Sequence, residues 1–426
     1  MKTGENENIP IFNIEKEAFN DLKGDVEGIE RRSLGNKDLV DFAIGTPPYE
    51  LFPLKSLQES CNNFLSNGEL PTYLQYGAGQ GSEKLRKELS NFINSELNKG
   101  CIYEKNNPPI CKPSNIFITN GSSHGLDLIC KLFTSNSDYI LVEESTYFFT
   151  FDIFKNYKLK IIPVKINQTE GVNLDDLKEK LYKYKPGFIY IIPTYHNPVG
   201  CTISYENREK LVEIIYEYNE QNEKKSYLVC DEVYQFLYFN IDKLPPSPIW
   251  YFDKKNKYII SLNSFSKIIA PGLRLGWIYS NNDKIIERIE TDGVVISGGG
   301  YNPFVGQMVY MIIKNGFLEK HLEFLRKEIG KRAETLYKSL INNFPNLNII
   351  KPEGGYFLWI DMKKDWDHEE LKKKALQKNT FFKIGSDCCV KDKEILEKYK
   401  NYVRICFSHY REERLKIGAD RLKEVF

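Results

Sequence analysis

The sequence has no excess of charge of either sign, no closely spaced cysteine pair and no long apolar run. Lysine and arginine number 59 against 58 aspartate and glutamate residues in a chain of 426. This balance gives no electrostatic reason to expect nucleic acid or an anionic membrane surface as a partner. A small-molecule ligand fits the composition better, and the length predicts either a large domain together with a smaller one or two comparable units.

Cysteine occurs nine times but never in a CxxC pair. An odd number of scattered cysteines argues against a disulfide framework and against a zinc site, so we expect reduced thiols, a cytoplasmic location and no metal. The start, "MKTGENENIPIFNIEKEAF", lacks an apolar signal core and is too acidic for a transit peptide. We therefore interpret the chain as soluble and untargeted, and the sequons at Asn120 and Asn167 as chance matches. The cysteines are Cys61, Cys101, Cys111, Cys130, Cys201, Cys230, Cys388, Cys389 and Cys406.

From about residue 115 the sequence alternates between two kinds of segment. Short β-rich runs such as "NIFIT", "YILVEE", "GFIYIIP" and "SYLVCDEVY" are separated by helical patterns such as "NLDDLKEKLYKY". This alternation predicts an α/β domain with a largely parallel sheet that helices cover on both faces. Only a few residues separate "YIISLNSFS" from "LRLGWIYS", so this pair should be antiparallel or at an edge.

After "GGGYNPF" the chain becomes helical and then gives the short strands "GGYFLWID" and "YVRICFS" around a further helix. The pattern predicts a second, smaller α+β domain. We expect residues 1–50 to pack on that smaller domain, residues 51–310 to form the large α/β domain, and residues 311–426 to form the small one.

The loops that follow the predicted parallel strands identify the candidate site. In open parallel sheets ligands bind at the carboxyl ends of the strands. The loops at that edge are 121–123, 144–147, 195–198, 231–234 and 264–267.

The stretch "SLNSFSKIIAPGLRLGW" places Lys267 between two apolar runs. Most lysines between strands simply point into water. A lysine near packed structure, however, loses solvation, and its pKa falls until the amine becomes nucleophilic. The stretch alone favours a functional lysine only slightly over an incidental one.

"NGSSHG" follows a predicted strand and opens a helix. Its backbone N–H groups and hydroxyls could hold a phosphate at the positive end of the helix dipole, or simply cap the helix. The same letters match the G-x-S-x-G nucleophile elbow, with Ser123 as a nucleophile and Asp231 and His409 completing a triad. An α/β serine hydrolase is therefore an alternative.

Three further polar residues occupy positions in the sequence that require an explanation. Asp231 directly ends an apolar strand, where a partly buried carboxylate requires a cationic or N–H partner, whereas Glu232 beside it is a plausible cap. Asn197 precedes a proline, which biases its backbone to an extended conformation, although a turn would also explain this motif. Arg404 lies inside an apolar strand-like run, where either a carboxylate-binding fork or a structural ion pair would account for it.

One cofactor explains this set. Pyridoxal phosphate requires a lysine for its imine, an acid for its ring nitrogen, donors for its ring oxygen and a cradle for its phosphate. The motifs "GSSHGLDL", "PTYHNPVG", "DEVY", "SFSKIIAPGLRLGW" and "VRICFS", in this order, resemble the class I/II aminotransferases of fold type I. The branch that contains the kynurenine/2-aminoadipate and multisubstrate aminotransferases is the most similar. This resemblance covers nearly the whole chain and implies a mostly parallel seven-stranded sheet in the large domain.

The resemblance implies a role for each residue around the cofactor ring. Lys267 is similar to the lysine that forms the Schiff base and later acts as general acid and base. Asp231 is similar to the carboxylate at the pyridinium nitrogen, and Asn197 and Tyr234 to the pair that hydrogen-bonds the ring oxygen. Tyr147, in "EESTYFF", resembles the aromatic residue that stacks on the ring.

The resemblance also implies residues for the phosphate and for the substrate. Tyr76, in "LQYGAGQG", is similar to the residue that reaches the phosphate of a neighbouring subunit, which implies a homodimer with shared active sites. Arg404 is similar to the fork that binds the substrate α-carboxylate, near Gly45 and Asn197. The residues that resemble the phosphate cradle are Ser122, Ser123, Ser264 and Arg274.

The expected activity is transfer of an amino group between an L-amino acid, of aromatic or 2-aminoadipate type, and a 2-oxo acid, with ping-pong kinetics. Ser123, His124, the "EES" motif and the glycine run 298–300 depart from the family pattern, and we expect that region to affect side-chain specificity at the substrate entrance. Carbon–sulfur β-elimination on the same fold is an alternative. An aminotransferase-like regulator ranks lowest, because Lys267 is present and no basic helix-turn-helix extension is seen.

Overall fold

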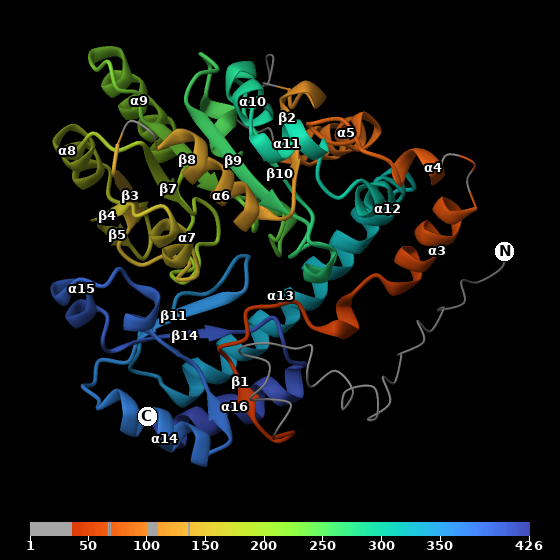
Figure 1. Ribbon diagram of the computed structural model, residues 1–426. Helices are drawn as coiled ribbons and strands as arrows, with labels where there is room; N and C mark the ends of the chain where they lie inside the picture. Colours follow the sequence, from red (N-terminus) through yellow and green to blue (C-terminus); the bar gives the residue numbers. More distant parts are fainter. Residues whose placement is uncertain (1–35, 67, 69, 101–109, 135–136) are drawn as a thin grey trace.

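The computed structural model describes residues 36–66, 68, 70–100, 110–134 and 137–426. Its strands are β1 (Val40–Asp41), β2 (Ile116–Thr119), β3 (Tyr139–Glu143), β4 (Lys160–Val164), β5 (Ile166–Asn167), β6 (Gly171–Val172), β7 (Phe188–Ile191), β8 (Tyr227–Asp231), β9 (Ile259–Ser264), β10 (Gly276–Tyr279), β11 (Phe357–Asp361), β12 (Thr380–Phe381), β13 (Lys383–Ile384) and β14 (Tyr402–Cys406). Figure 1 shows their arrangement.

The helices are α3 (Leu54–Leu65), α4 (Leu70–Tyr73), α5 (Glu83–Gly100), α6 (Ser122–Phe133), α7 (Thr150–Asn156), α8 (Leu174–Tyr184), α9 (Tyr205–Gln221), α10 (Asp283–Glu290), α11 (Gly293–Gly298), α12 (Pro303–Lys314), α13 (Phe317–Asn343), α14 (His368–Gln377), α15 (Lys393–Lys398) and α16 (Glu412–Val425). None of those in the described ranges combines the length and the apolar character that crossing a membrane requires.

A seven-stranded sheet with the order β2-β10-β9-β8-β7-β3-β4 forms the centre of the larger part of the molecule. Strands β9, β8, β7, β3 and β4 pair in parallel, whereas β10 is antiparallel to both of its neighbours. The predicted seven-stranded, mostly parallel sheet is therefore confirmed, as is the antiparallel pairing of the two runs around Lys267.

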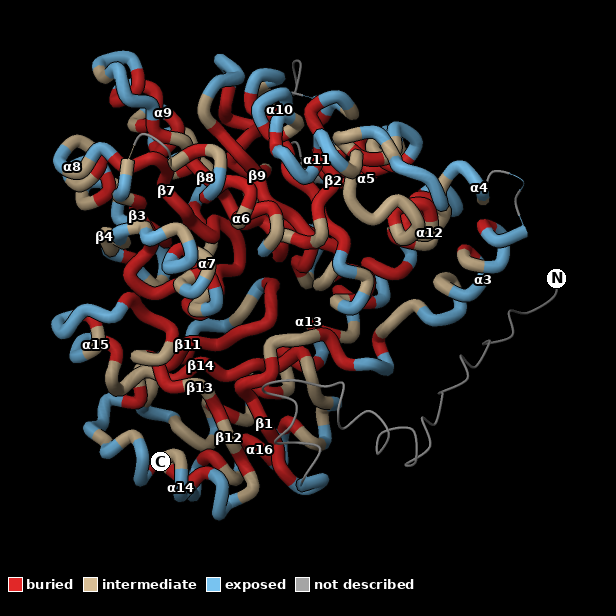
Figure 2. Tube along the Cα trace, in the orientation of Figure 1, coloured by how far each residue is buried: buried red, intermediate tan, exposed pale blue. Residues whose placement is uncertain are grey.

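Alternate residues of the strands of this sheet pack into two cores on its opposite faces. Phe117, Ile140 and Phe188 face the core of α6, α7 and α10, whereas their neighbours Ile118 and Ile189 face the core of α5, α8 and α9. Strands buried on both faces read as continuous apolar runs, which explains the pattern in the sequence. Figure 2 shows the buried strands beneath a more exposed layer of helices.

The C-terminal part of the chain builds a separate three-stranded sheet with the order β11-β14-β13. The long helix α13 runs from the seven-stranded sheet towards this smaller sheet (Figure 1). The early strand β1 pairs in parallel with β12, so residues 40 and 41 lie on the C-terminal part. Most of the expected N-terminal segment, residues 1–35, lies outside the described residues, and the domain boundaries stay predictions.

Candidate active site

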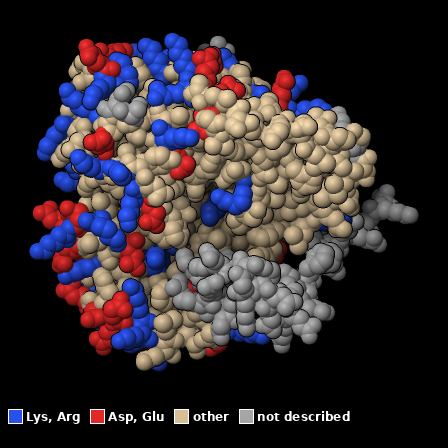
Figure 3. Space-filling view, viewed as in Figure 1, with Lys and Arg blue, Asp and Glu red and all other residues tan. Residues whose placement is uncertain are grey.

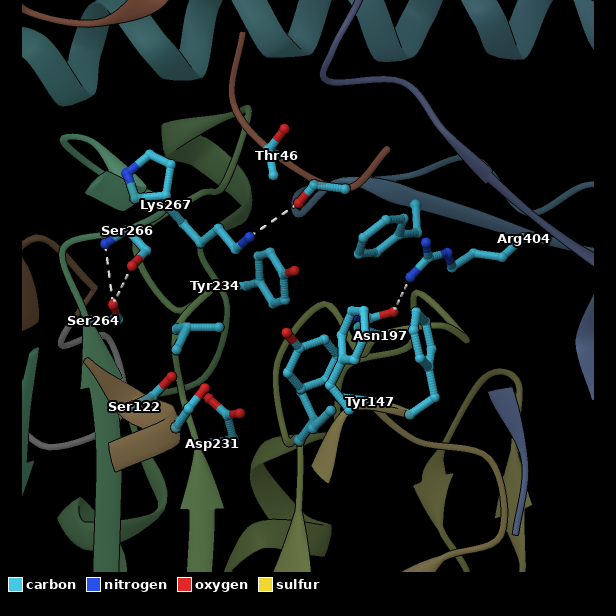
Figure 4. A pocket seen from close by; sticks show the side chains of 18 of the residues that line it. Thr46, Ser122, Tyr147, Asn197, Asp231, Tyr234, Ser264, Ser266, Lys267 and Arg404 are labelled. Carbon is cyan, nitrogen blue, oxygen red and sulfur yellow. Dashed lines mark hydrogen bonds between the residues drawn. The ribbon is translucent and has the colours of Figure 1, made fainter. Parts of the chain in front are cut away.

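A cavity of about 250 Å³ opens at the carboxyl ends of β3, β7, β8 and β9, beside β11 and β14. All the residues predicted for the site except Tyr76 line it, and Figure 4 shows several of them facing one another. The lining residues are Ala43, Gly45, Thr46, Ser122, Ser123, Tyr147, Phe148, Phe149, Ile192, Asn197, Asp231, Val233, Tyr234, Ser264, Ser266, Lys267, Pro271, Arg274, Phe357 and Arg404.

Lys267 follows β9 in a turn and reaches into this cavity. Its Nζ donates a hydrogen bond to the carbonyl oxygen of Gly45 over 2.9 Å, and it lies 5.8 Å from the centre of the Tyr356 ring. Desolvation lowers the pKa of Lys267 to about 8 from its usual 10.5. At neutral pH the site therefore supplies a larger fraction of neutral, nucleophilic amine than an exposed lysine would.

Asp231 ends β8 and is 7% exposed. Its Oδ2 accepts a hydrogen bond from the Tyr190 hydroxyl over 2.7 Å, while Oδ1 is buried without a partner among the described residues. Desolvation raises the pKa of this carboxyl group to about 6, against hydrogen bonds and cations that lower it. A buried acceptor of this kind requires a donor, and the protonated ring nitrogen of pyridoxal phosphate is a suitable one.

The opposite end of the cavity is built to hold an anion. Helix α6 begins at Ser122 after Gly121, whose φ of 87° directs the chain into the helix. The Ser264 hydroxyl lies 2.8 Å from that of Ser266. Among the described residues, the only hydrogen bonds of the Arg274 guanidinium are long ones of 3.3 and 3.5 Å to the carbonyl oxygens of Asn120 and Pro271. A helix N-terminus, hydroxyls and an arginine without a carboxylate partner fit a phosphate group.

Arg404 reaches the cavity from β14 and is 2% exposed. Its Nη1 donates to Oδ1 of Asn197 over 2.9 Å and its Nη2 to the carbonyl oxygen of Ala43 over 2.8 Å. Within the described part of the chain its Nε has no partner, and no carboxylate pairs with the guanidinium. The structural ion pair that the sequence left open is thus not what holds Arg404. A desolvated guanidinium with a spare donor fits a substrate carboxylate.

The remaining predicted residues surround this centre. Burial raises the pKa values of Tyr147 and Tyr234, so both phenols stay protonated and can donate. Because Oδ1 of Asn197 accepts from Arg404, its amide nitrogen is left to donate elsewhere. A Cβ atom at Gly45 would lie 2.8 Å from the Phe357 ring, so a larger residue would require this ring to move.

Two features that we expected at the site do not line the cavity. Tyr76 is 80% exposed at the surface, and the glycine run 298–300 does not line the cavity. The run instead packs on the loop that follows Tyr76. A Cβ atom at Gly299 or Gly300 would lie 2.2 or 2.1 Å from the carbonyl oxygen of Gly77 or Ala78.

The hydrolase triad is not assembled. Ser123 and Asp231 line the cavity, but His409 lies in a different depression together with Tyr49 and Arg411. Glu232 is not a helix cap either. It is buried, and it accepts hydrogen bonds from the Ile249 N–H over 2.7 Å and from the Ser261 hydroxyl.

Sequence reasoning missed several residues that support the site. Tyr190 holds Asp231, Tyr356 donates to the carbonyl oxygen of Lys267 over 3.1 Å, and Phe148 and Phe357 flank Arg404 at 5.4 and 4.3 Å. Each of them stands in an apolar run, where nothing in the sequence separates a site residue from a core residue.

A reactive lysine, a buried carboxylate and an anion cradle at one sheet edge are what a pyridoxal phosphate enzyme requires. The profile of the family "Aminotransferase class I and II" matches residues 37–422. The chain belongs to this family.

Characterised relatives agree with this assignment. The chain is 29% identical over 393 residues to aromatic-amino-acid aminotransferase 1 of Thermococcus litoralis, which covers 91% of this chain and 88% of the relative. A kynurenine aminotransferase of Pyrococcus horikoshii in complex with PMP superposes with a TM-score of 0.79 at 26% identity, over 97% and 96% of the two chains. An α-aminoadipate aminotransferase of Thermus thermophilus, complexed with N-(5'-phosphopyridoxyl)-L-leucine, gives 0.77 at 25%, over 96% and 97%.

Proposed function

We propose that the protein is a pyridoxal-phosphate-dependent aminotransferase that moves an amino group between an L-amino acid and a 2-oxo acid. The observation that carries this proposal is the unfilled hydrogen-bonding capacity in one cavity. Oδ1 of Asp231 lacks a donor and Nε of Arg404 lacks an acceptor among the described residues, with Lys267 lining the same cavity. A cofactor ring nitrogen and a substrate carboxylate would satisfy these two atoms.

The residues present fit the cofactor part by part. Lys267 would attach its aldehyde, Asp231 would pair with its ring nitrogen, Tyr147 would stack on the ring, and Asn197 and Tyr234 would donate to the ring oxygen. The hydroxyls and guanidinium of Ser122, Ser123, Ser264 and Arg274 would hold its phosphate. When bound, pyridoxal phosphate supplies a sink for the electrons of the substrate Cα–H bond.

The protein contributes position and proton transfer. Arg404 binds the α-carboxylate and thereby fixes the orientation of the Cα–H bond, and positioning of this kind can contribute about 7–11 kcal/mol of a barrier. Lys267, the only lysine that lines the cavity in the described part of the chain, takes the Cα proton and returns one at the end of the cycle. The amino acid and the oxo acid use the same cavity in turn, which gives ping-pong kinetics.

The substrate class follows from the wall beside Arg404. Phe148, Phe149 and Phe357 line this end of the cavity, and aromatic rings of this kind pack well against an aromatic or long side chain. The relatives named for aromatic amino acids and 2-aminoadipate support the same class.

The test is to incubate the purified protein and cofactor with a panel of amino acids and 2-oxoglutarate. Transamination predicts stoichiometric appearance of the two half-reaction products. Release of ammonia and pyruvate would instead indicate elimination, and the absence of any change in cofactor absorbance with the whole panel would refute the proposal.

We also infer that the protein works as a cytoplasmic homodimer. Tyr76, Leu74 and Ile296 are 80%, 67% and 73% exposed, and Figure 3 shows few charged side chains on the surface over α12. Apolar side chains of this size exposed together support a protein interface. The eight described cysteines are free thiols, which suits a reducing compartment, and the balanced charge gives no attraction towards nucleic acid or an anionic membrane.

A further inference from the structure

Outside the lining of the cavity, a buried carboxylate and a buried imidazole form a pair. Glu143 ends β3, and His196 follows β7, one residue before Asn197. Oε2 of Glu143 lies 2.9 Å from Nε2 of His196, and both side chains are fully buried.

The hydrogen bonds fix which atom carries the proton. The Val199 N–H, which can only donate, approaches Nδ1 of His196 at 3.2 Å. Nδ1 is therefore the acceptor and Nε2 carries the hydrogen that it donates to Glu143. The same Oε2 also accepts from the Ile192 N–H over 2.9 Å. One carboxylate oxygen thus holds the segment between Ile192 and His196 at both of its ends.

The segment 192–196 contains a backbone conformation that its surroundings must stabilise. Tyr195, directly before His196, has a φ of 47°, a conformation that a bulky residue keeps only when its surroundings fix it. Further bonds close the turn: the His196 N–H donates to the carbonyl oxygen of Cys201 over 2.9 Å, and the Gly200 N–H donates to that of His196 over 2.7 Å. The next residue, Asn197, is the one that orients Arg404.

We propose that Glu143 and His196 are positioning residues that set the place of the Asn197 amide and, through it, of the Arg404 guanidinium. Glu143 acts as a hydrogen-bond acceptor for two donors of the segment rather than as a charge. This inference rests on the proposed function, because it assumes that Asn197 contacts the cofactor ring and Arg404 the substrate carboxylate. Neither Glu143 nor His196 lines the cavity.

The experiment compares two substitutions at one position. Glu143→Gln keeps an oxygen that can accept both hydrogen bonds, whereas Glu143→Met has a similar volume and no acceptor. For the holoenzyme of each variant we would measure visible circular dichroism of the cofactor, which reports its orientation, and the Kd of 3-phenylpropionate, a carboxylate that cannot react. Turnover and thermal unfolding of the apoprotein complete the set.

Glu143→Met should weaken 3-phenylpropionate binding by up to about tenfold, the effect of one hydrogen bond, and change the cofactor band. It should reduce kcat/KM by about 10²-fold, as a displacement of about 1 Å does. Glu143→Gln should stay close to wild type in all three. Asp253→Leu is the control. It removes a buried carboxylate that accepts hydrogen bonds before the start of β9, whereas Lys267 and the cavity lie beyond the end of this strand. This variant should be less stable than wild type but should keep the cofactor band and the Kd of 3-phenylpropionate.

The inference is wrong if Glu143→Met matches wild type, if Glu143→Gln is as impaired as Glu143→Met, or if Asp253→Leu changes the same two signals. Should Glu143→Met fail to fold, His196→Gln, which retains a donor towards Glu143, and His196→Leu, which does not, make the same comparison. A wild type without transaminase activity would refute the proposed function instead. An active wild type with indistinguishable variants would refute this inference alone.

Discussion

The Nζ atom of Lys267 donates a hydrogen bond over 2.9 Å to the carbonyl oxygen of Gly45, which lies 222 residues earlier in the chain. Figure 4 shows this bond at the wall of the cavity. The bond restrains the lysine side chain in the apoprotein. A carbonyl oxygen is not a base, however, so this bond does not deprotonate the amine. Burial therefore controls when the amine becomes reactive, and this has a measurable consequence.

The rate of cofactor uptake by the apoprotein should rise with pH through about 8. Only the neutral amine is nucleophilic, and burial lowers the pKa of Lys267 to about 8, so the neutral fraction grows above that pH. Stopped-flow absorbance of apoprotein mixed with pyridoxal phosphate measures this rate between about pH 6 and about pH 10. A midpoint at 10.5, the usual lysine value, would contradict the lowered pKa.

Lys267→Ala should leave a folded protein that cannot be covalently labelled with the cofactor. Turnover should fall by about 10²-fold to 10⁴-fold or more, because the variant lacks the residue that is proposed both to attach the cofactor and to transfer the proton. Borohydride reduction followed by peptide mass spectrometry detects the label at residue 267 in the wild type. Lys243→Ala, which removes an exposed lysine paired with Glu353, should behave like wild type. Labelling that persists in Lys267→Ala would assign the attachment to another residue.

Asp231→Asn should stabilise the apoprotein while weakening cofactor binding. Burial raises the folded-state pKa of Asp231 from 3.8 to about 6, so at pH 7 its ionised form opposes folding by up to about 3 kcal/mol. This cost is fully present above about pH 6 and disappears as the pH falls to 3.8, and the advantage of the variant should shrink over the same range. Urea unfolding of both apoproteins at about pH 7 and pH 4 checks the sign. A variant less stable than wild type at pH 7 would contradict it.

Arg404→Lys should raise KM for the amino acid by about 10-fold to 100-fold and change kcat less. A lysine presents a single ammonium, whereas the guanidinium binds Asn197 and Ala43 and keeps further donors for the carboxylate that it is proposed to bind. Steady-state kinetics with one amino donor separates the two parameters. Arg411→Lys, at an exposed arginine, serves as the control. An unchanged KM would show that the carboxylate binds elsewhere.

Subunits that carry different lesions should complement each other. If Tyr76 acts on the partner's site, a hybrid of a Lys267→Ala subunit and a Tyr76→Ala subunit contains one site with both residues intact. If the two variants are nearly inactive alone, mixing them under conditions of subunit exchange should therefore restore activity. Differently tagged chains, purified through both tags, allow the hybrid to be assayed alone. A hybrid as inactive as its parents would place Tyr76 outside the partner's site.

The motifs predicted the family by resemblance, whereas the local pattern of the sequence predicted the parallel sheet and the gathering of the site at its edge. Apolar runs mark strands buried on both faces, and the carboxyl ends of parallel strands bring Asp231, Asn197 and Lys267 to one edge. The roles of these residues come from the resemblance and stay predictions.

Contacts between distant segments could not be predicted in this way. The pairing of Arg404 with the carbonyl oxygen of Ala43 joins residues 361 positions apart, and no periodicity encodes it. Tyr190 stands among apolar core residues, so its hydroxyl gave no distinct signal, whereas Glu143 ends an apolar run as Asp231 does and could have been singled out in the same way. Tyr76 is missing from the cavity of a single chain, as a residue that serves another subunit would be.

Gly299 and Gly300 pack closely against the backbone of Gly77 and Ala78. This contact predicts which residues homologues can have at these positions. Two stretches of backbone meet there at a separation that excludes even a methyl group, and the Gly300 N–H donates to the carbonyl oxygen of Gly77 over 3.4 Å, so the loop bearing Tyr76 is placed by backbone contacts. A homologue with alanine or anything larger at 299 or 300 must route that loop differently. A residue other than glycine at 299 or 300 should therefore be accompanied by a different backbone path at residues 77 and 78.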